Sequence, residues 1–382
     1  YTGNVTVAIG TNPGGGTLSG TKTVAAVAGV ATFSSLTIDK SGTGYTLTAA
    51  ANNLGGATSS TFNITPAAVS QLGFTVEPSN AMAGAMIAPA VKVAGQDAFG
   101  NTVTSFTGSV TIAITPGSGT SGAALSGITM VNASSGIATF SNLSIDKTGA
   151  DYHLTASSGA LTPATSAIFA ITSGAATHLT FDQQPATTVA GSPMTVSVTA
   201  RDALENPVKT FTGNVTVAIA VNPGGGTLGG TKILAAVQGT ATFSTLTIDK
   251  AASGYRLSAT AGGLAPDTST AFAITAGAAT KLAFTVQPAA TLANAVITPA
   301  VEVTAQDAFG NTVTSFTGNV AIAITPGTGT AGAVLTGLTP VAAVAGVSRF
   351  SDLSINLAGT GYKLTASAGG LSAATSVVFN IN

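Results

Sequence analysis

A repeat with a period of 105 residues is the feature that most constrains the fold of this chain. The triplet [YF]-T-G occurs once per period, and its four copies begin at Tyr1, Phe106, Phe211 and Phe316. The chain also has a second, longer repeat of 210 residues. The segment QDAFGNTVTSFTG shows it, since this segment occupies residues 96–108 and again 306–318. Copies therefore alternate between two types, A, B, A, B. A chain with such a period folds as a series of similar units.

The repeat predicts four copies with boundaries at 1–69, 70–176, 177–279 and 280–382. Linkers of a few residues join successive copies, so we expect the copies to stack end to end as an elongated rod. The first copy begins at Tyr1, which aligns with Phe106, and is therefore partial: it lacks the two leading strands. We expect either that a longer parent chain continues upstream or that another chain supplies these strands, and the longer parent is the simpler account.

Within one copy the apolar residues recur with a period of two, which is typical of β-strands. In the fourth copy Val301, Val303 and Ala305 alternate with polar residues, and no segment has a capped 3.6-residue period. Short alternating strands, about seven per copy, predict an all-β protein of tandem immunoglobulin-like sandwiches. A tyrosine recurs where the sixth strand begins, at Tyr45, Tyr152, Tyr255 and Tyr362. This position predicts a tyrosine corner, in which the hydroxyl bonds to upstream backbone.

Composition excludes several classes of partner. Only 7% of residues are charged and the net charge is −1, so no basic surface is available for nucleic acid. The most apolar run, residues 81–91, is too short to insert in a membrane. The chain has no cysteine, which removes disulfides and thiolate metal sites. The excess of Thr, Ser and Gly over charged residues favours an exported bacterial protein.

Three segments of the fourth copy carry a resemblance to a known family: VTAQDAFGNTVTSFTGNVAI (303–322), AGVSRFSDLSI (345–355) and TGYKLTAS (360–367). They resemble the bacterial Ig-like (Big) repeats of invasin- and intimin-type adhesins and of very large surface proteins. The resemblance extends over every copy. It implies an extracellular or cell-surface location and a role as a stalk that carries some other module.

No motif for catalysis is present: the chain has no HExxH, nucleophile elbow or clustered carboxylate pair, so we predict a protein that is not an enzyme and has no cofactor. The aspartates of the repeated D-A-x-x-N turn, Asp97, Asp202 and Asp307, are weak calcium candidates. Calcium requires six to eight oxygen ligands, and one Asp per turn provides too few. The favoured interpretation is an Asx-type turn with Gly100 and Gly310 at positive φ.

Two functions follow from these patterns. The first is a structural segment of a bacterial extracellular fibre or adhesin stalk, which acts by modular spacing and by lateral association with copies of itself. The alternative is a module that binds carbohydrate or a host protein, with Phe99 and Phe309 on the turns as contact residues. For these two rings, packing over the end of the sandwich is the favoured interpretation. A third possibility is an accessory region of a secreted enzyme.

Overall fold

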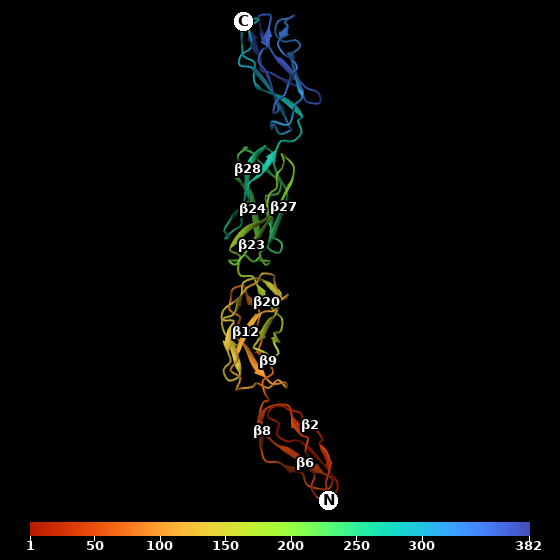
Figure 1. The fold of residues 1–382 in the computed structure, drawn as a ribbon. Coiled ribbons are helices and arrows are strands. Elements are labelled where there is room, and N and C mark those ends of the chain that lie inside the picture. Colours follow the sequence, from red (N-terminus) through yellow and green to blue (C-terminus); the bar gives the residue numbers. More distant parts are fainter. The chain divides into compact units, whose positions relative to one another are not determined.

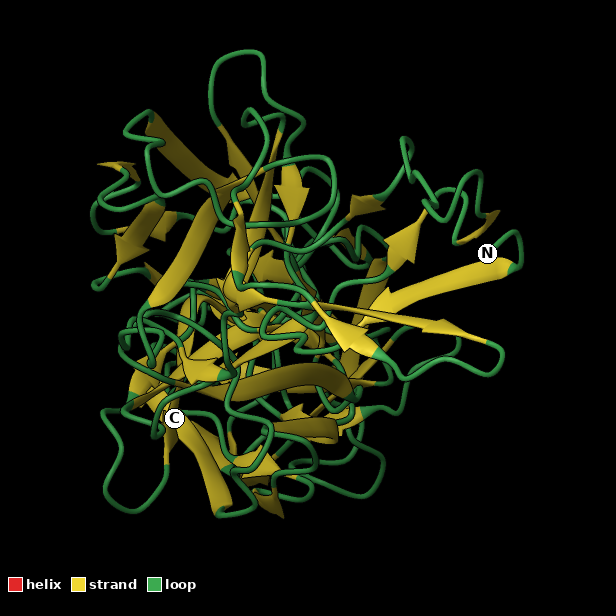
Figure 2. Cartoon of the chain, turned by 90° about the horizontal axis from the view of Figure 1, so that it is seen from below, coloured by secondary structure: helices red, strands yellow, loops and turns green.

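The computed structural model describes all 382 residues, and every regular element in it is a β-strand. Figure 2 shows strands and loops throughout and no helix. The all-β prediction is therefore confirmed. The chain forms two compact units: unit 1 contains residues 1–174 and 203–206, and unit 2 contains residues 175–202 and 207–382. No helix is present that could cross a membrane.

The strands of the first two copies all lie in unit 1 (Figure 1). Residues 1–69 contain β1 (Asn4–Ile9), β2 (Leu18–Ser19), β3 (Thr23–Ala25), β4 (Thr37–Ile38), β5 (Gly42–Tyr45), β6 (Leu47–Ala51), β7 (Ala57–Thr58) and β8 (Phe62–Ile64). The second copy contains β9 (Gln71–Val76), β10 (Ala81–Met82), β11 (Val91–Gln96), β12 (Ser109–Ile114), β13 (Leu125–Ser126), β14 (Met130–Asn132), β15 (Ile137–Phe140), β16 (Ser144–Ile145), β17 (Gly149–Tyr152), β18 (Leu154–Ser157), β19 (Ala164–Thr165) and β20 (Phe169–Thr172).

The strands of the third and fourth copies lie in unit 2. The third copy contains β21 (His178–Gln183), β22 (Thr188–Val189), β23 (Met194–Arg201), β24 (Asn214–Val221), β25 (Leu228–Gly229), β26 (Ile233–Ala235), β27 (Thr240–Ile248), β28 (Ala252–Thr260), β29 (Asp267–Thr268) and β30 (Phe272–Thr275). The fourth contains β31 (Lys281–Val286), β32 (Val301–Gln306), β33 (Asn319–Ile324), β34 (Leu335–Thr336), β35 (Val341–Ala342), β36 (Val347–Phe350), β37 (Ser354–Ile355), β38 (Gly359–Tyr362), β39 (Leu364–Ser367), β40 (Ala374–Thr375) and β41 (Phe379–Ile381).

The third copy has the longest strands and displays the sandwich most fully. One sheet has the order β21-β23-β27-β25, and the other has the order β22-β30-β28-β24-β26 with β29 beside β28. Alternate residues from both sheets meet in one core: Val198 and Phe243 come from the first sheet, and Val215 and Leu257 from the second, all with no exposed surface. The fold is an immunoglobulin-like sandwich, as predicted.

The second and fourth copies have the same arrangement with shorter strands, and each copy has a core of its own. Their strands outnumber the expected total of about seven because the chain changes sheets within a single apolar run. At Lys363 it passes from β38, which pairs with β41, to β39, which pairs with β33. Alternation also fails at one equivalent position of both copies, where Ala94 and Thr304 are buried; the hydroxyl of Thr304 bonds to Thr285 at 2.9 Å.

The tyrosines of the repeat are fully buried, and each hydroxyl donates to a backbone carbonyl five residues upstream. These bonds are Tyr45 to Lys40 (2.9 Å), Tyr152 to Lys147 (2.9 Å), Tyr255 to Lys250 (2.8 Å) and Tyr362 to Leu357 (2.8 Å). Burial is the largest effect on Tyr255 and raises its pKa, although backbone amides of Gly226 and Gly224 lower it. The hydroxyl therefore keeps its proton at neutral pH and remains a donor.

Replacing Tyr255 with Phe should weaken the third copy by about 1–2 kcal/mol, because the part-buried hydrogen bond from its hydroxyl to the carbonyl of Lys250 is lost. Hydrogen exchange of peptides that span residues 246–257 measures this change. Tyr1→Phe is the matched control, since Tyr1 is 49% exposed and its hydroxyl bonds to Asn4 at 3.3 Å. Equal exchange in Tyr255→Phe and in the parent chain would contradict the structural role of the hydroxyl.

Candidate functional site

The candidate site is built on the D-A-x-x-N turn that follows β11, β23 or β32 in the complete copies. In the second copy the side chain of Asp97 is 1% exposed. Its Oδ1 accepts hydrogen bonds from the backbone N–H of Phe99 and of Asn101, both at 2.9 Å. Gly100 has φ 78°, which L-residues rarely adopt. The local geometry is thus that of an Asx-type turn.

The other oxygen of Asp97 holds the linker that precedes the second copy. Oδ2 accepts from the backbone N–H of Ala67 at 3.0 Å and from Nδ2 of Asn101 at 2.9 Å. The carboxylate therefore faces four N–H donors, whereas a calcium site surrounds its ion with oxygens. No group of three or more His, Cys, Asp or Glu side chains is placed to hold a metal ion. This geometry favours the Asx-turn interpretation of Asp97 over the calcium one.

Asn101 extends the bonding to the first copy. Its Nδ2 also donates to the carbonyl of Asp39 at 2.8 Å, and its Oδ1 accepts from the backbone N–H of Ser41 at 3.0 Å. Nζ of Lys40 donates to the carbonyl of Phe99 at 2.6 Å. The amide of Asn101 thus uses both its donors and its acceptor, which fixes its orientation.

The loop that receives Asn101 is itself held by its own copy. The tyrosine-corner bond from Tyr45 fixes the carbonyl of Lys40, and Oδ1 of Asp39 accepts from the backbone N–H of Thr17 at 2.6 Å. We call residues 39–41, 67 and 97–101 the first junction. It forms one continuous chain of hydrogen bonds, from a buried tyrosine of one copy to the linker and the turn of the next.

Unit 2 contains a second junction with the same bonds, formed by residues 249–251, 277 and 307–311. Asp307 accepts from Phe309 and Asn311 N–H at 2.9 Å and from Gly277 N–H at 3.0 Å. Asn311 bonds to the carbonyl of Asp249 and to the N–H of Ala251, both at 2.9 Å. Nζ of Lys250 donates to the carbonyl of Phe309 at 2.7 Å.

The third copy carries the same turn residues. Asn206, which belongs to unit 1, donates to the carbonyl of Asp146 at 2.8 Å and accepts from Thr148 N–H at 3.0 Å. Asp202 is 3% exposed. Glu205 takes the place of Gly100 and has φ 66°, so this copy adopts the left-handed conformation without glycine.

The electrostatics of the turn follow from its geometry. Burial, the largest effect, raises the pKa of Asp97 and of Asp307, because it disfavours the charged form. The side-chain amide of Asn101 or Asn311 and three backbone N–H groups lower the pKa. Together these hydrogen bonds outweigh burial, and both carboxyls titrate below their ordinary value of 3.8.

The structure revises the interpretation of the two turn phenylalanines. Phe309 is 42% exposed and lies against the preceding copy: a Cβ built on Gly191 would stand 2.3 Å from its ring. Phe99 is 58% exposed. The ring of Phe309 therefore lies on the preceding copy, a contact that the sequence did not indicate.

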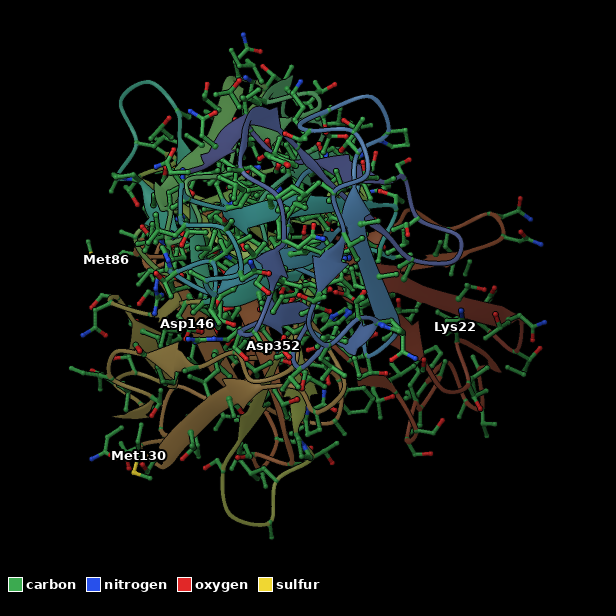
Figure 3. All side chains as sticks on the ribbon, turned by 90° about the horizontal axis from the view of Figure 1, so that it is seen from above. Lys22, Met86, Met130, Asp146 and Asp352 are labelled. Atoms are coloured by element: carbon green, nitrogen blue, oxygen red, sulfur yellow. The ribbon has the colours of Figure 1, made fainter.

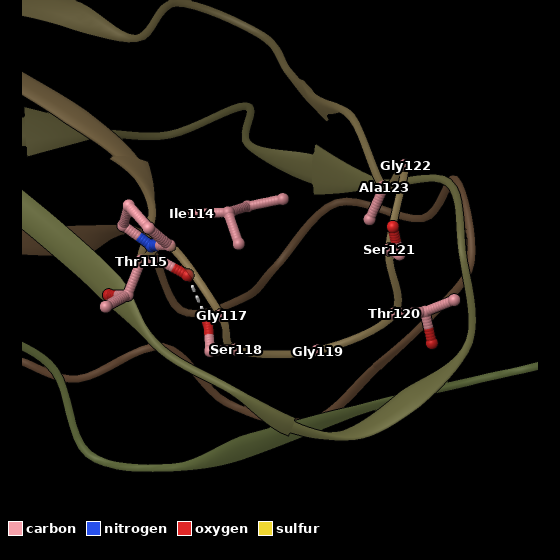
Figure 4. A pocket seen from close by; sticks show the side chains of 10 residues that line it. Ile114, Thr115, Gly117, Ser118, Gly119, Thr120, Ser121, Gly122 and Ala123 are labelled. Carbon is pink, nitrogen blue, oxygen red and sulfur yellow. Dashed lines mark hydrogen bonds between the residues drawn. The ribbon is translucent and has the colours of Figure 1, made fainter.

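A hollow of about 460 Å³ lies beside residues 114–123 (Figure 4). Its lining is Gly, Ser, Thr, Pro, Ala and Ile, with no charged side chain. The hydroxyl of Ser118 donates to the carbonyl of Thr115 at 2.8 Å, as the dashed line marks. The glycine-rich loop NPGGGTL of the A-type copies is likewise fixed from within, by Asn12 bonded to Gly16 through two 2.8 Å bonds. Both loops are structural connections between strands.

Sequence reasoning missed that the turn bonds to the preceding copy. A signal was present: Lys40, Lys147 and Lys250 occupy one repeated position, and each precedes a D-A-x-x-N turn by about sixty residues. The fourth copy has Leu357 at this position, and its tyrosine-corner bond is retained. The lysine is thus dispensable for the sandwich itself.

No family model matches the chain, and no curated protein matches it. Among solved structures, the chain is similar to the Escherichia coli adhesin FdeC, with 17% identity over 84% of this chain and 100% of that chain and a TM-score of 0.36. Domains 4–9 of the surface layer protein SbsC share 15% identity over 91% of this chain and 55% of theirs, with a TM-score of 0.24. A β-glycosidase from Bacteroides vulgatus shares 13% identity over 55% of this chain and 25% of its own, with a TM-score of 0.22. At these TM-scores the likeness says nothing of function.

The depressed pKa values predict how the junctions respond to acid. Groups whose folded pKa lies below the unfolded value stabilise the fold above the unfolded pKa, and this stability is lost as pH falls through the folded pKa. The junctions should therefore keep full strength above about pH 5 and weaken below the unfolded value of 3.8. Titration of the aspartate side-chain carbons by ¹³C NMR measures both midpoints. A midpoint for Asp97 or Asp307 above 3.8 would contradict the bonding described.

Gly310→Ala should destabilise the second junction by about 1–2 kcal/mol, because φ 80° is unfavourable for an L-residue. The added methyl has room, since its nearest neighbours, Gln306 Oε1 and Lys250 Nζ, would lie at 3.8 and 3.9 Å. Gly369→Ala is the control, because nothing lies within 4 Å and its φ is ordinary. Hydrogen exchange at residues 307–311 measures the effect. Equal exchange in the two variants would show that the turn does not need the left-handed conformation.

Proposed function

We propose that this chain is a non-catalytic structural segment of a bacterial extracellular fibre or cell-surface adhesin stalk, in which four Ig-like modules (1–69, 70–176, 177–279 and 280–382) act in series as a spacer. The observation that carries the proposal is the pair of junctions with identical bonding. Such a connection keeps two neighbouring modules at a fixed spacing, and it requires no ligand.

The junctions support a spacer function because they restrict the reorientation of one module relative to the next, which a short linker usually allows. Domains joined by a linker and a small polar interface reorient by default. Here the linker N–H of Ala67 or Gly277 is bonded to the same carboxylate that shapes the turn, and the turn is bonded to a loop held by a buried tyrosine. Each bond to a charged group contributes about 1.5–3 kcal/mol. Modules connected in this way keep a fixed spacing, which is the basis for proposing an elongated rod.

The surface supports self-association as the partner interaction. The chain has 25 charged residues in 382, so repulsion between neighbouring copies is weak. Several large apolar side chains are exposed, among them Met86 (65%), Met130 (62%) and Leu338 (65%). Met86 and Met130 project from the ribbon in Figure 3. We propose that lateral contacts between chains use them.

The carbohydrate-binding alternative depends on the exposed ring of Phe99. That ring is 58% exposed, whereas Phe309, its equivalent in the fourth copy, lies against Gly191 of the third copy. A glycan array distinguishes the two functions. The spacer function predicts no retention; sugar-specific retention that is lost in Phe99→Ala would favour the binding module instead.

The spacer function predicts that the asparagines of the junctions control the dimensions of the chain. In the double variant Asn101→Ala/Asn311→Ala, the asparagine bonds to loops 39–41 and 249–251 are lost, only the lysine bonds to Phe99 and Phe309 remain, and each sandwich keeps its core. Small-angle X-ray scattering should then show a broader distribution of interatomic distances. Asn52→Ala/Asn319→Ala is the control, because both of these asparagines are exposed. Identical scattering from the parent chain and the junction variant would refute the spacer function.

A further inference from the structure

The edge strand β14 of the second copy has an open side. It ends the sheet of order β14-β12-β18-β19 and pairs with β12. The carbonyl of Thr129 and the N–H of Ala133 bond toward β12, at 2.8 and 3.0 Å. Because alternate residues of a strand bond to opposite sides, Met130 and Asn132 direct their N–H and C=O groups away from β12. No hydrogen bond in the structure uses these four groups.

The opposite edge of the same sheet is closed. There Thr162, two residues before β19, donates to the carbonyl of Ser70 at 3.0 Å and accepts from the N–H of Leu72 in β9 at 2.9 Å. Backbone bonds thus continue this edge into β9. β14 is therefore the edge at which the sheet can take up another strand.

The equivalent edges of the other three copies carry residues that oppose such an addition. Natural proteins protect exposed edges with lysine and proline. Lys22 and Lys232 stand directly before β3 and β26, and Pro340, which has no N–H, stands directly before β35. The second copy has Thr129 and Met130 at these two positions. Among the four equivalent edges, β14 is the one that carries neither lysine nor proline.

The surface beside β14 is apolar and uncharged. Ile128 and Met130 are 59% and 62% exposed. The side chain of Met130 projects from the ribbon in Figure 3. Residues 98–145 contain no Asp, Glu, Lys, Arg or His. Two identical surfaces of this kind meet without like-charge repulsion.

We propose that β14 pairs antiparallel with β14 of a second copy of this chain, about a two-fold axis through Val131. In this register Met130 lies opposite Asn132 of the second copy and exchanges two backbone hydrogen bonds with it. The symmetric pair of residues adds two more, so the free groups of both strands are all bonded. The two Met130 side chains are then diagonal neighbours, which long side chains can bridge.

A second copy is the partner because the edge is self-complementary. A two-fold interface places the same segment on both chains, and here each free N–H then faces a free C=O. The inference rests on the proposed lateral self-association of the chain, and it assigns that contact to one strand.

Hydrogen exchange of the full chain, measured over a series of protein concentrations, tests this pairing. Exchange at residues 128–134 should slow as the concentration rises and as sedimentation velocity shows dimers. Exchange at the equivalent segments 21–27, 231–237 and 338–344 should not depend on concentration, because lysine or proline protects those edges.

Two variants place the protecting residues of the other copies on this edge. Met130→Pro removes an outward N–H from each chain, and Thr129→Lys adds the lysine of the A-type copies. Each should raise the dissociation constant of the dimer at least about tenfold, because two of the four hydrogen bonds are lost or a charge is brought to the contact. The same residues stand in folded sandwiches of this chain, and circular dichroism checks that both variants fold. Ile233→Pro is the matched control in the third copy and should leave association unchanged.

Three results would overturn the pairing. The first is a dimer in which exchange at residues 128–134 does not depend on concentration. The second is a dimer that forms equally well in the parent chain, in Met130→Pro and in Thr129→Lys; in both cases the lateral contact lies elsewhere on the surface. The third is a chain that stays monomeric at every concentration, which would leave the edge to a strand of another protein. None of these results bears on the spacer function, which the scattering of the Asn101→Ala/Asn311→Ala variant tests separately.

Discussion

The buried carboxylate of the D-A-x-x-N turn is the group on which the connection between copies depends. A buried charge is costly unless hydrogen bonds satisfy it, and Asp97 and Asp307 each accept four. Because these donors come from the turn and the linker, ionisation of one side chain orders both segments. The asparagine of the turn then bonds this ordered segment to the preceding copy.

The remaining stability comes from apolar packing and neutral hydrogen bonds. The chain has no disulfide, and the ion pairs of Arg201 with Asp182 and of Arg349 with Glu302 are surface contacts of small value. No buried side-chain nitrogen or oxygen lacks a hydrogen-bond partner. Each complete sandwich therefore depends on its own core and its tyrosine corner, and the junctions add the connection between cores.

The sequence was sufficient to predict features that depend on local pattern. The period of two predicted the strands. The repeated tyrosine marked a position that is fully buried in the structure. The turn motif alone predicted the positive φ of Gly100. Contacts between distant residues were not predictable in this way. Asn101 bonds to a carbonyl 62 residues away, and Phe309 packs on Gly191 in another copy. The point at which the chain changes sheets was not predictable either; at Lys363, where it does so, the backbone N–H donates to the Thr328 hydroxyl, a contact 35 residues distant in sequence.

The central claim is that a turn of one copy is bonded to a loop of the copy before it in solution. The backbone N–H of Ala251 tests it most directly, since this group donates to Oδ1 of Asn311 at 2.9 Å and lies in a loop outside any strand. Hydrogen exchange resolved by NMR should find this amide protected in the parent chain and exposed in Asn311→Ala, with Thr242 in β27 unchanged in both. Exchange of Ala251 at the rate of an unfolded peptide in the parent chain would contradict the account.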